Sequence, residues 1–195
     1  QSETVWHQAD TYRVPRLTFV NKMDRIGADF LGTVALMKEK LGARPAVIQL
    51  PWGVEDGFEG IIDLIEMKAI SWDEETLGAT FRELSIPEEI LPAARKHRED
   101  LVETLAERND ALMEKYLNGT EISAVEITAA LREATLKFDL VPVLCGAALR
   151  NKGIQPLLDA VTDFLPSPVD VPPVQGFNPK TNEPESRAPS DKEPF

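Results

Sequence analysis

The stretch RLTFVNKMDRIGADF, residues 16–30, ends a short apolar segment in three polar side chains. Asn21, Lys22 and Asp24 stand where a plain turn would have a Gly or a Pro, and neither comes before Gly27. Guanine offers two adjacent donors, N1–H and the N2 amino group, and an ionised carboxylate accepts both at roughly 1.5–3 kcal/mol per bond. Adenine cannot offer that pair. The pattern Asn-Lys-x-Asp after a strand therefore predicts a loop that reads guanine.

Each polar side chain of this loop has an expected role. Asp24 would accept the two guanine donors. The methylenes of Lys22 would lie over the base while its ammonium stays in water. Asn21 would brace the loop, and its amide can reach the edge of the base. The alternative is a polar loop after a strand that holds no ligand.

A second loop supplies what the first one lacks. A guanine site also needs a donor for O6, and a backbone N–H in the loop after the next core strand can provide it. VLCGAALRNKG, residues 143–153, is such a loop. The N–H of Ala148 would donate to O6, with Ala147 and Leu149 beside it. Ligands of open α/β sheets bind beyond the carboxyl ends of the strands, so we expect the two loops to converge.

Composition narrows the class of protein. The chain has 195 residues, of which 43% are hydrophobic, and a formal net charge of −12. A net negative charge disfavours electrostatic binding to the phosphates of nucleic acids, so no direct nucleic-acid contact is predicted. The apolar runs are too short to span a membrane, and the first ten residues have no signal-peptide pattern. The single cysteine, Cys145, excludes an internal disulfide and favours a reducing, cytoplasmic location.

The pattern at both ends of the chain predicts an α/β fold with a layered sheet. A helix is expected over residues 2–13 and a strand over 17–20. A second helix should follow its N-cap Asp29, carry one apolar stripe, and end at Gly42. LVPVLCG reads as a strand that is buried on both faces. A helix lined by apolar residues follows it: Ile154, Leu157, Leu158, Val161 and Leu165.

The middle of the chain reads as a separate α+β unit. PAVIQL and GIIDLIEMKAISW predict strands. Charged helices follow, one from near Pro87 with Glu88 and Glu89 in its first turn, and one over about 109–117. A third starts at Ser123, which forms a capping box with Glu126.

These patterns divide the chain into three parts. Residues 1–42 and 139–165 would form the sheet domain, and residues 43–138 an inserted α+β subdomain. Residues 166–195 contain eight of the 15 prolines and would form a linker or the start of another domain.

Several longer segments together resemble one family. QSETVWHQA, FVNKMDRIGADF, GIIDLIEMKAISW, LMEKYL, NKGIQPLLDAV and FLPSPVDVPPVQG closely resemble bacterial translation elongation factor G. The resemblance implies a translational GTPase that drives tRNA and mRNA translocation on the ribosome. It also implies a partial P-loop-type GTPase sheet with an inserted α+β subdomain and a proline-rich linker that approaches a β-barrel domain.

The resemblance also implies a GTP or GDP ligand and Mg²⁺, although parts of such a site are missing. The chain has no Gly-x-x-x-x-Gly-Lys-Ser/Thr element and no Asp-x-x-Gly element before the first helix. The ligands of Mg²⁺ are thus expected upstream, and this chain alone is expected to hydrolyse no GTP. The strand at 17–20 would lack a partner on one side, which is an aggregation hazard.

One residue departs from the family pattern. The resemblance implies a serine at position 147 whose hydroxyl helps to orient the aspartate, but this chain has Ala147. The loss leaves the Ala148 N–H in place and removes one hydrogen bond, worth about 1 kcal/mol. Either base affinity is lower than in the relatives, or another group or water replaces the hydroxyl.

The acidic helices between 87 and 137 leave two interpretations open. One is a solvated face, and the other is a docking surface, since the resemblance implies contact between the inserted subdomain and the stalk protein of the ribosome. Two alternatives for the whole chain also remain. It could belong to a sister translational GTPase, such as a release-factor GTPase or a tetracycline ribosomal protection protein. It could also be a non-catalytic acidic docking module in which Asn-Lys-x-Asp is incidental.

Overall fold

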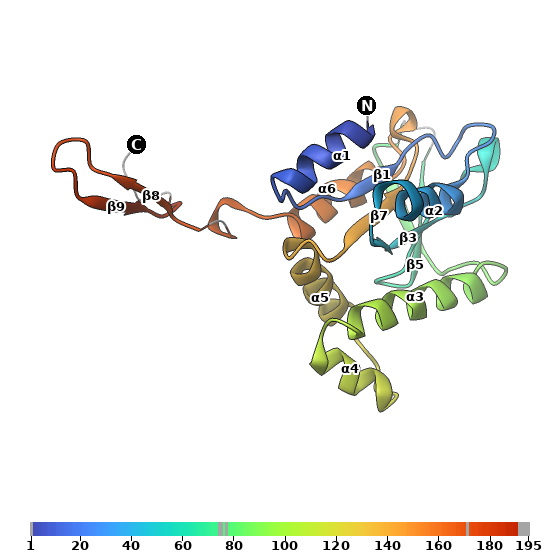
Figure 1. Ribbon diagram of the computed structural model, residues 1–195. Coiled ribbons are helices and arrows are strands. Elements are labelled where there is room, and N and C mark those ends of the chain that lie inside the picture. The colour runs from blue at the N-terminus through green and yellow to red at the C-terminus, as the bar shows by residue number, and fades with distance from the viewer. Residues whose placement is uncertain (1, 74–75, 77, 171, 191–195) are drawn as a thin grey trace. The chain divides into compact units, whose positions relative to one another are not determined.

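The computed structural model describes every residue except 1, 74–75, 77, 171 and 191–195. The chain forms two compact units, residues 1–165 and residues 166–195 (Figure 1).

A parallel sheet holds the ends of the two loops predicted to read guanine. It consists of β1 (Thr18–Val20), β7 (Val141–Cys145) and β2 (Pro45–Val47), in the order β1-β7-β2. All five residues of the central strand β7 are buried, as its continuous apolar sequence predicted. Val20 lies opposite Cys145, so the carboxyl ends of β1 and β7 meet at one edge of the sheet.

Three helices belong to the same part of the fold: α1 (Ser2–Thr11), α2 (Phe30–Leu41) and α6 (Ile154–Phe164). The caps of α2 are those predicted, because the Asp29 carboxylate accepts from the Gly32 N–H at 2.8 Å and Gly42 is left-handed. The expected apolar stripe of α6 is only partly buried. Leu158 and Val161 are exposed, and Ala160 and Phe164 fill the core instead.

A second, antiparallel sheet follows β2. Its order is β3 (Gln49–Trp52), β4 (Gly60–Asp63), β5 (Lys68–Trp72) and β6 (Phe81–Leu84). PAVIQL, predicted as one strand, is divided between the two sheets at Ile48. Its N–H donates to Val143 O at 3.2 Å, and its carbonyl accepts from Leu64 N at 3.0 Å. The parallel sheet thus includes a strand from the stretch 43–138, all of which the sequence had assigned to the insertion.

The charged helices are α3 (Leu91–Ala106), α4 (Asp110–Leu117) and α5 (Ala124–Leu136). The predicted capping box between Ser123 and Glu126 is present at the start of α5. The predicted start of α3 was too early, since Pro87–Ile90 form a turn and Glu88 and Glu89 precede the helix. Figure 1 shows the three helices as consecutive segments joined by short connections.

The core of residues 1–165 has two apolar clusters that meet at β7. Val143 and Cys145 pack with α2 and the antiparallel sheet, whereas Leu144 packs with α3 and α5. Alternate side chains of β7 therefore pack on opposite faces of the parallel sheet, as expected for a strand that is covered on both sides. Among the described residues, no helix is both long enough and apolar enough to cross a membrane.

The second unit contains an antiparallel hairpin. Strands β8 (Val174–Phe177) and β9 (Pro184–Arg187) pair from Val174 opposite Arg187 to Phe177 opposite Pro184. The side chains of β8 are all exposed.

Short 3-10 turns complete the described elements of the chain: Glu55–Gly57, Ala148–Arg150 and Pro168–Asp170.

Candidate functional site

Backbone hydrogen bonds join the two loops that follow β1 and β7. The Gly146 N–H donates to Val20 O at 3.1 Å, and the Met23 N–H donates to Gly146 O at 3.1 Å. The parallel ladder thus continues for one step past both strands. The loop containing Asn-Lys-x-Asp and the loop containing Ala148 begin side by side.

Asn21 links the two loops through its side chain. Its Oδ1 accepts from the Ala148 N–H at 2.9 Å and from the Lys22 N–H at 2.8 Å. The backbone donor that the sequence predicted for guanine O6 is therefore held by an amide oxygen. A base that takes this N–H would share the bond or replace Asn21 as the acceptor.

Asp24 is the buried polar residue of the first loop. Its side chain is 8% exposed, and its Oδ2 lies 3.2 Å from Nε of Arg150, whose own side chain is 44% exposed. Arg150 ends the 3-10 turn Ala148–Arg150, so one turn carries both the Ala148 N–H and the arginine that contacts Asp24. Sequence reasoning missed Arg150, although a cation close after the expected donor was a signal that could have found it.

A pocket of about 460 Å³ opens beside the Asp24–Arg150 pair. Its wall is formed by residues of both loops and one from the turn before β4: Asp24, Arg25, Ile26, Asp56, Leu149 and Arg150. Leu149 is 84% exposed and Lys22 is also exposed, so both are free to contact a ligand. Lys22 has a φ of 65°, in the left-handed region that few residues other than glycine adopt.

Ala147 faces the interior, unlike its neighbours in the predicted site. It is buried in the core, and its N–H donates to Lys152 O at 2.9 Å while its carbonyl accepts from the Lys152 N–H at 3.2 Å. Ala148 is half-buried. Of the predicted residues, Asn21 contacts Ala148 directly, and Asp24 contacts the turn of Ala148 through Arg150. The side chains of Lys22 and Leu149 are exposed.

Lys152 and Gly146 fix the path of the second loop. Lys152 is 4% exposed, and its Nζ donates to Phe58 O at 3.0 Å. Gly146 passes so close to other atoms that an added Cβ would lie 2.4 Å from Lys152 O and 2.6 Å from a ring carbon of Phe19. The sequence did not predict a buried lysine here, because lysine is rarely buried without a partner that only the fold supplies.

Comparison with known proteins identifies the family. A family described as "Elongation factor Tu GTP binding domain" matches residues 1–167 of the chain. The chain belongs to this family. It is also 54% identical to elongation factor G of Aquifex pyrophilus over 195 residues, which is 100% of this chain and 28% of that protein. The α/β class and the resemblance to elongation factor G, both expected from the sequence, are confirmed.

A solved structure from Thermus thermophilus has a similar fold. It is 29% identical with a TM-score of 0.75, and the match covers 88% of this chain and 26% of that one. The chain therefore spans less than a third of the length of the relatives that it matches.

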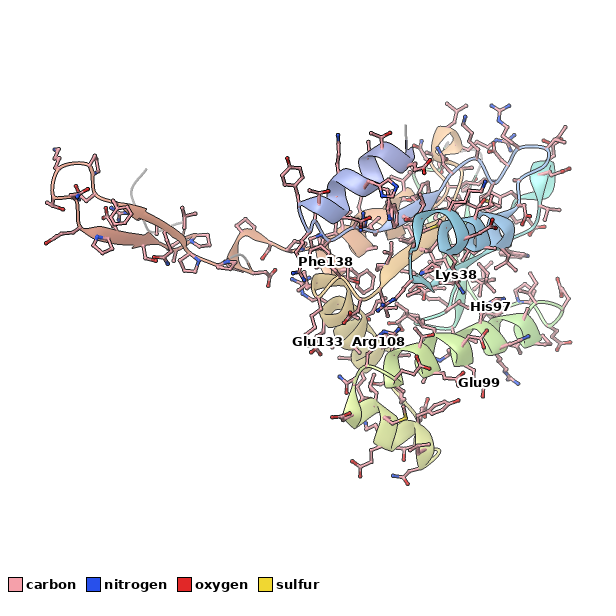
Figure 2. The ribbon with its side chains drawn as sticks, viewed as in Figure 1. Lys38, His97, Glu99, Arg108, Glu133 and Phe138 are labelled. Atoms are coloured by element: carbon pink, nitrogen blue, oxygen red, sulfur yellow. The ribbon has the colours of Figure 1, made fainter. Side chains whose placement is uncertain are left out.

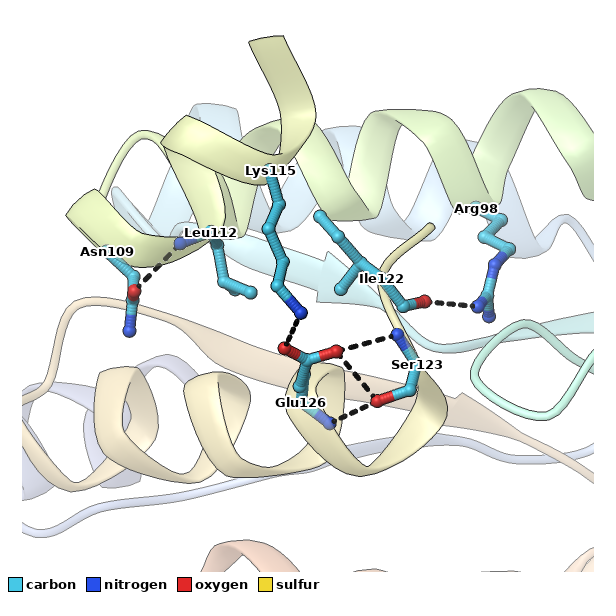
Figure 3. A network of polar contacts seen from close by, with 7 residues as sticks. All are labelled: Arg98, Asn109, Leu112, Lys115, Ile122, Ser123 and Glu126. Atoms are coloured by element: carbon cyan, nitrogen blue, oxygen red, sulfur yellow. Dashed lines mark hydrogen bonds and ion pairs between the residues drawn. The ribbon is translucent and has the colours of Figure 1, made fainter. Parts of the chain in front are cut away.

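The charged helices of this GTP-binding domain are held by a polar network (Figure 3). Lys115 Nζ donates to Glu126 Oε1 at 2.5 Å, and Ser123 donates to Oε2 from its N–H and its hydroxyl at 3.1 and 2.8 Å. These bonds, that from Lys115 first, lower the pKa of Glu126 to about 2. Arg98 joins α3 to Leu64 O at 2.7 Å and to Ile122 O at 3.2 Å.

Glu99 and Glu103 are exposed on α3, with exposed Arg95 and Lys96 one turn before Glu99. Figure 2 shows Glu99 pointing away from the sheets, whereas Lys38 and His97 line a pocket of about 270 Å³ between α2 and α3. The carboxylate of Glu103, together with burial and then Glu99 and Asp100, raises the pKa of Tyr116 above its ordinary value. That shift places the phenol of Tyr116 close to the carboxylates of α3.

The remaining candidates for chemistry have structural roles. Cys145 is fully buried in β7, and burial raises the pKa of its thiol far above the ordinary value, which disfavours the nucleophilic thiolate. Among the described residues, no group of three or more His, Cys, Asp or Glu side chains could hold a metal ion.

Proposed function

We propose that this chain provides the guanine-recognition half of the nucleotide site of a ribosomal translocase of the elongation factor G type. The observation that carries the proposal is the convergence of the two loops. Asn21 Oδ1 accepts the Ala148 N–H at 2.9 Å, and the Arg150 of the same turn contacts Asp24 at 3.2 Å. The intact protein would bind and hydrolyse GTP to drive movement of tRNA and mRNA.

The geometry suits guanine better than adenine. Asp24 is buried, so its carboxylate would meet N1–H and the N2 amino group with little competition from water. Adenine presents an acceptor at N1 and no amino group at C2, which leaves the buried carboxylate without donors. The Ala148 N–H would donate to O6, and the exposed side chains of Lys22 and Leu149 would cover the faces of the base.

The phosphate half of the site is not part of this proposal for the chain itself. The sequence has no phosphate-binding glycine loop, and the described residues offer no cluster of metal ligands. Mg²⁺ would neutralise phosphate charge when bound, and its ligands would come from other parts of the intact protein. The chain alone would therefore hydrolyse no GTP, and turnover above the uncatalysed rate would contradict this.

The decisive experiment changes the base that the site prefers. Asp24→Asn in a protein with the complete GTP-binding domain replaces an acceptor by an amide that can donate to the C2 carbonyl of xanthine. We expect GDP affinity to fall by at least about tenfold, as the loss of charge-assisted bonds implies, and XDP affinity to rise. Isothermal titration with both nucleotides measures this.

A matched control is Asp139→Asn. Asp139 also pairs with an arginine, Arg44 at 3.9 Å, but it lies at the opposite end of the parallel sheet. It should leave the ratio of GDP to XDP affinity unchanged. An unchanged ratio for Asp24→Asn would overturn the proposed role of Asp24 and favour a docking module in which the motif is incidental.

We further propose that the outer face of α3 binds the stalk protein of the ribosome. Support comes from the exposed carboxylates Glu99 and Glu103 of that face. Acidic surfaces steer basic partners and speed their association. The alternative is that the outer face of α3 contacts only solvent and binds no partner.

A further inference from the structure

We propose that Arg150 is a positioning residue that orients the Asp24 carboxylate for guanine, an inference that rests on the proposed function. The structure assigns this role because Asp24 is buried and Arg150 contacts it at 3.2 Å. Among the residues that the structure describes, Arg150 is the only side chain paired with Asp24. A buried carboxylate with a single partner takes its orientation from that partner.

The physical reason lies in how a carboxylate rotates. The terminal torsion of Asp has a broad, roughly two-fold energy profile, so the plane of the carboxylate is weakly set by its own covalent structure. A cation 3.2 Å from Oδ2 attracts that oxygen and so favours one orientation of the plane. Bidentate recognition of N1–H and the N2 amino group requires both oxygens to face the base at once, and a rotated carboxylate would meet only one donor.

The pair can remain intact while the base is bound. Each carboxylate oxygen has two lone pairs, so Oδ2 can accept from a base N–H while Arg150 stays in ion-pair contact with it. Arg150 also offsets the cost of keeping the Asp24 charge away from water when the base closes the pocket.

The turn that carries Arg150 is itself well defined. The Arg150 N–H donates to Ala147 O at 2.9 Å, and the Asn151 N–H donates to Ala148 O at 3.0 Å. The side chain at position 147 is a methyl group and cannot donate to Asp24. The guanidinium two residues beyond Ala148 is therefore the side-chain cation that this turn brings to the carboxylate.

The experiment compares two bases that differ only at C2. IDP has N1–H and O6 but lacks the N2 amino group, so it needs one carboxylate oxygen where GDP needs two. In a protein with the complete GTP-binding domain, Arg150→Ala should weaken GDP about tenfold and IDP about twofold, as expected for one partly exposed charge-assisted contact. The ratio of GDP to IDP affinity, measured by titration calorimetry, should fall about fivefold.

Two further variants separate positioning from a general structural effect. Arg150→Lys keeps a donor cation and should recover at least half of the lost GDP-to-IDP ratio on a logarithmic scale. Arg44→Ala breaks the Arg44–Asp139 pair at the far end of the sheet and should leave the ratio unchanged. Thermal unfolding of each variant verifies that it is folded, and the half-exposed side chain of Arg150 predicts that it will be.

Three results would overturn the inference. They are an unchanged GDP affinity in Arg150→Ala, a raised GDP affinity, which would make Arg150 a competitor of the base, and equal losses for GDP and IDP. Asp24→Asn distinguishes these failures from failure of the proposed function. If that variant switches preference to xanthine while Arg150→Ala has no selective effect, only the role of Arg150 is wrong.

Discussion

At the scale of the residue, burial suits Asp24 to the role proposed for it in reading guanine. The side chain of Asp24 is 8% exposed and is paired with one cation, Arg150. An N–H group of a bound base would therefore displace little water from the carboxylate. The sequence located Asp24 because the spacing Asn-Lys-x-Asp is local. Arg150 was missed although it follows Ala148 closely, because no local pattern links it to Asp24, which comes far earlier in the chain, and only the fold brings the two together.

A second carboxylate, Glu126, predicts a pH effect. Lys115 and Ser123 lower its pKa from the ordinary 4.5 to about 2 in the folded chain. Because the folded value is depressed, the stabilisation is present above about pH 4.5 and is lost as the pH falls toward 2. Glu126→Gln should therefore be less stable than the parent chain at pH 7, and the difference should shrink between these two pH values.

Chemical denaturation at a series of pH values measures the Glu126 effect. Glu121→Gln is the matched control, because Glu121 is exposed and close in sequence but outside the capping box. A difference between Glu126→Gln and the parent chain that does not depend on pH in this range would contradict the role of the ionised carboxylate.

At the scale of the element, the sequence predicted those features that are determined by residues close together in the chain. The caps of α2 and the capping box of α5 were predicted because each is set by residues within a turn of the helix end. The break at Ile48 was not, because neither Ile48 nor its neighbours Val47 and Gln49 is a turn residue. Ile48 forms backbone hydrogen bonds toward both sheets, with Val143 in β7 and with Leu64 directly after β4. Strand β6 was missed because all four of its side chains are exposed and show no alternation.

The acidic face of α3 yields a prediction about partner binding. The double variant Glu99→Lys and Glu103→Lys should weaken binding to purified ribosomal stalk protein by about tenfold at low salt, and by less at high salt. Glu39→Lys, an equal change per residue on an exposed position of α2, is the control. Surface plasmon resonance measures both, and equal affinity for the double variant and the parent would favour a face covered only by water.

At the scale of the whole molecule, β7 connects the turn that is proposed to contact guanine with the two apolar cores of residues 1–165. Its residues pack into both cores, and its carboxyl end carries the turn with Ala148 and Arg150. Among the described strands, β1 pairs only with β7, so it forms one edge of the parallel sheet, as the sequence suggested. The α/β class followed from periodicity, whereas the meeting of the two loops could be expected only from the rule that parallel strands end at one edge.

The most direct measurement is a crystal structure of the complete GTP-binding domain with GDP. We predict that both carboxylate oxygens of Asp24 lie within about 2.7–3.2 Å of guanine N1 and N2, and that the Ala148 nitrogen lies within the same range of O6. Arg150 should still contact Asp24. A guanine ring bound elsewhere, or one with Asp24 turned away from its N1 and N2 edge, would contradict the proposal that these two loops read the base.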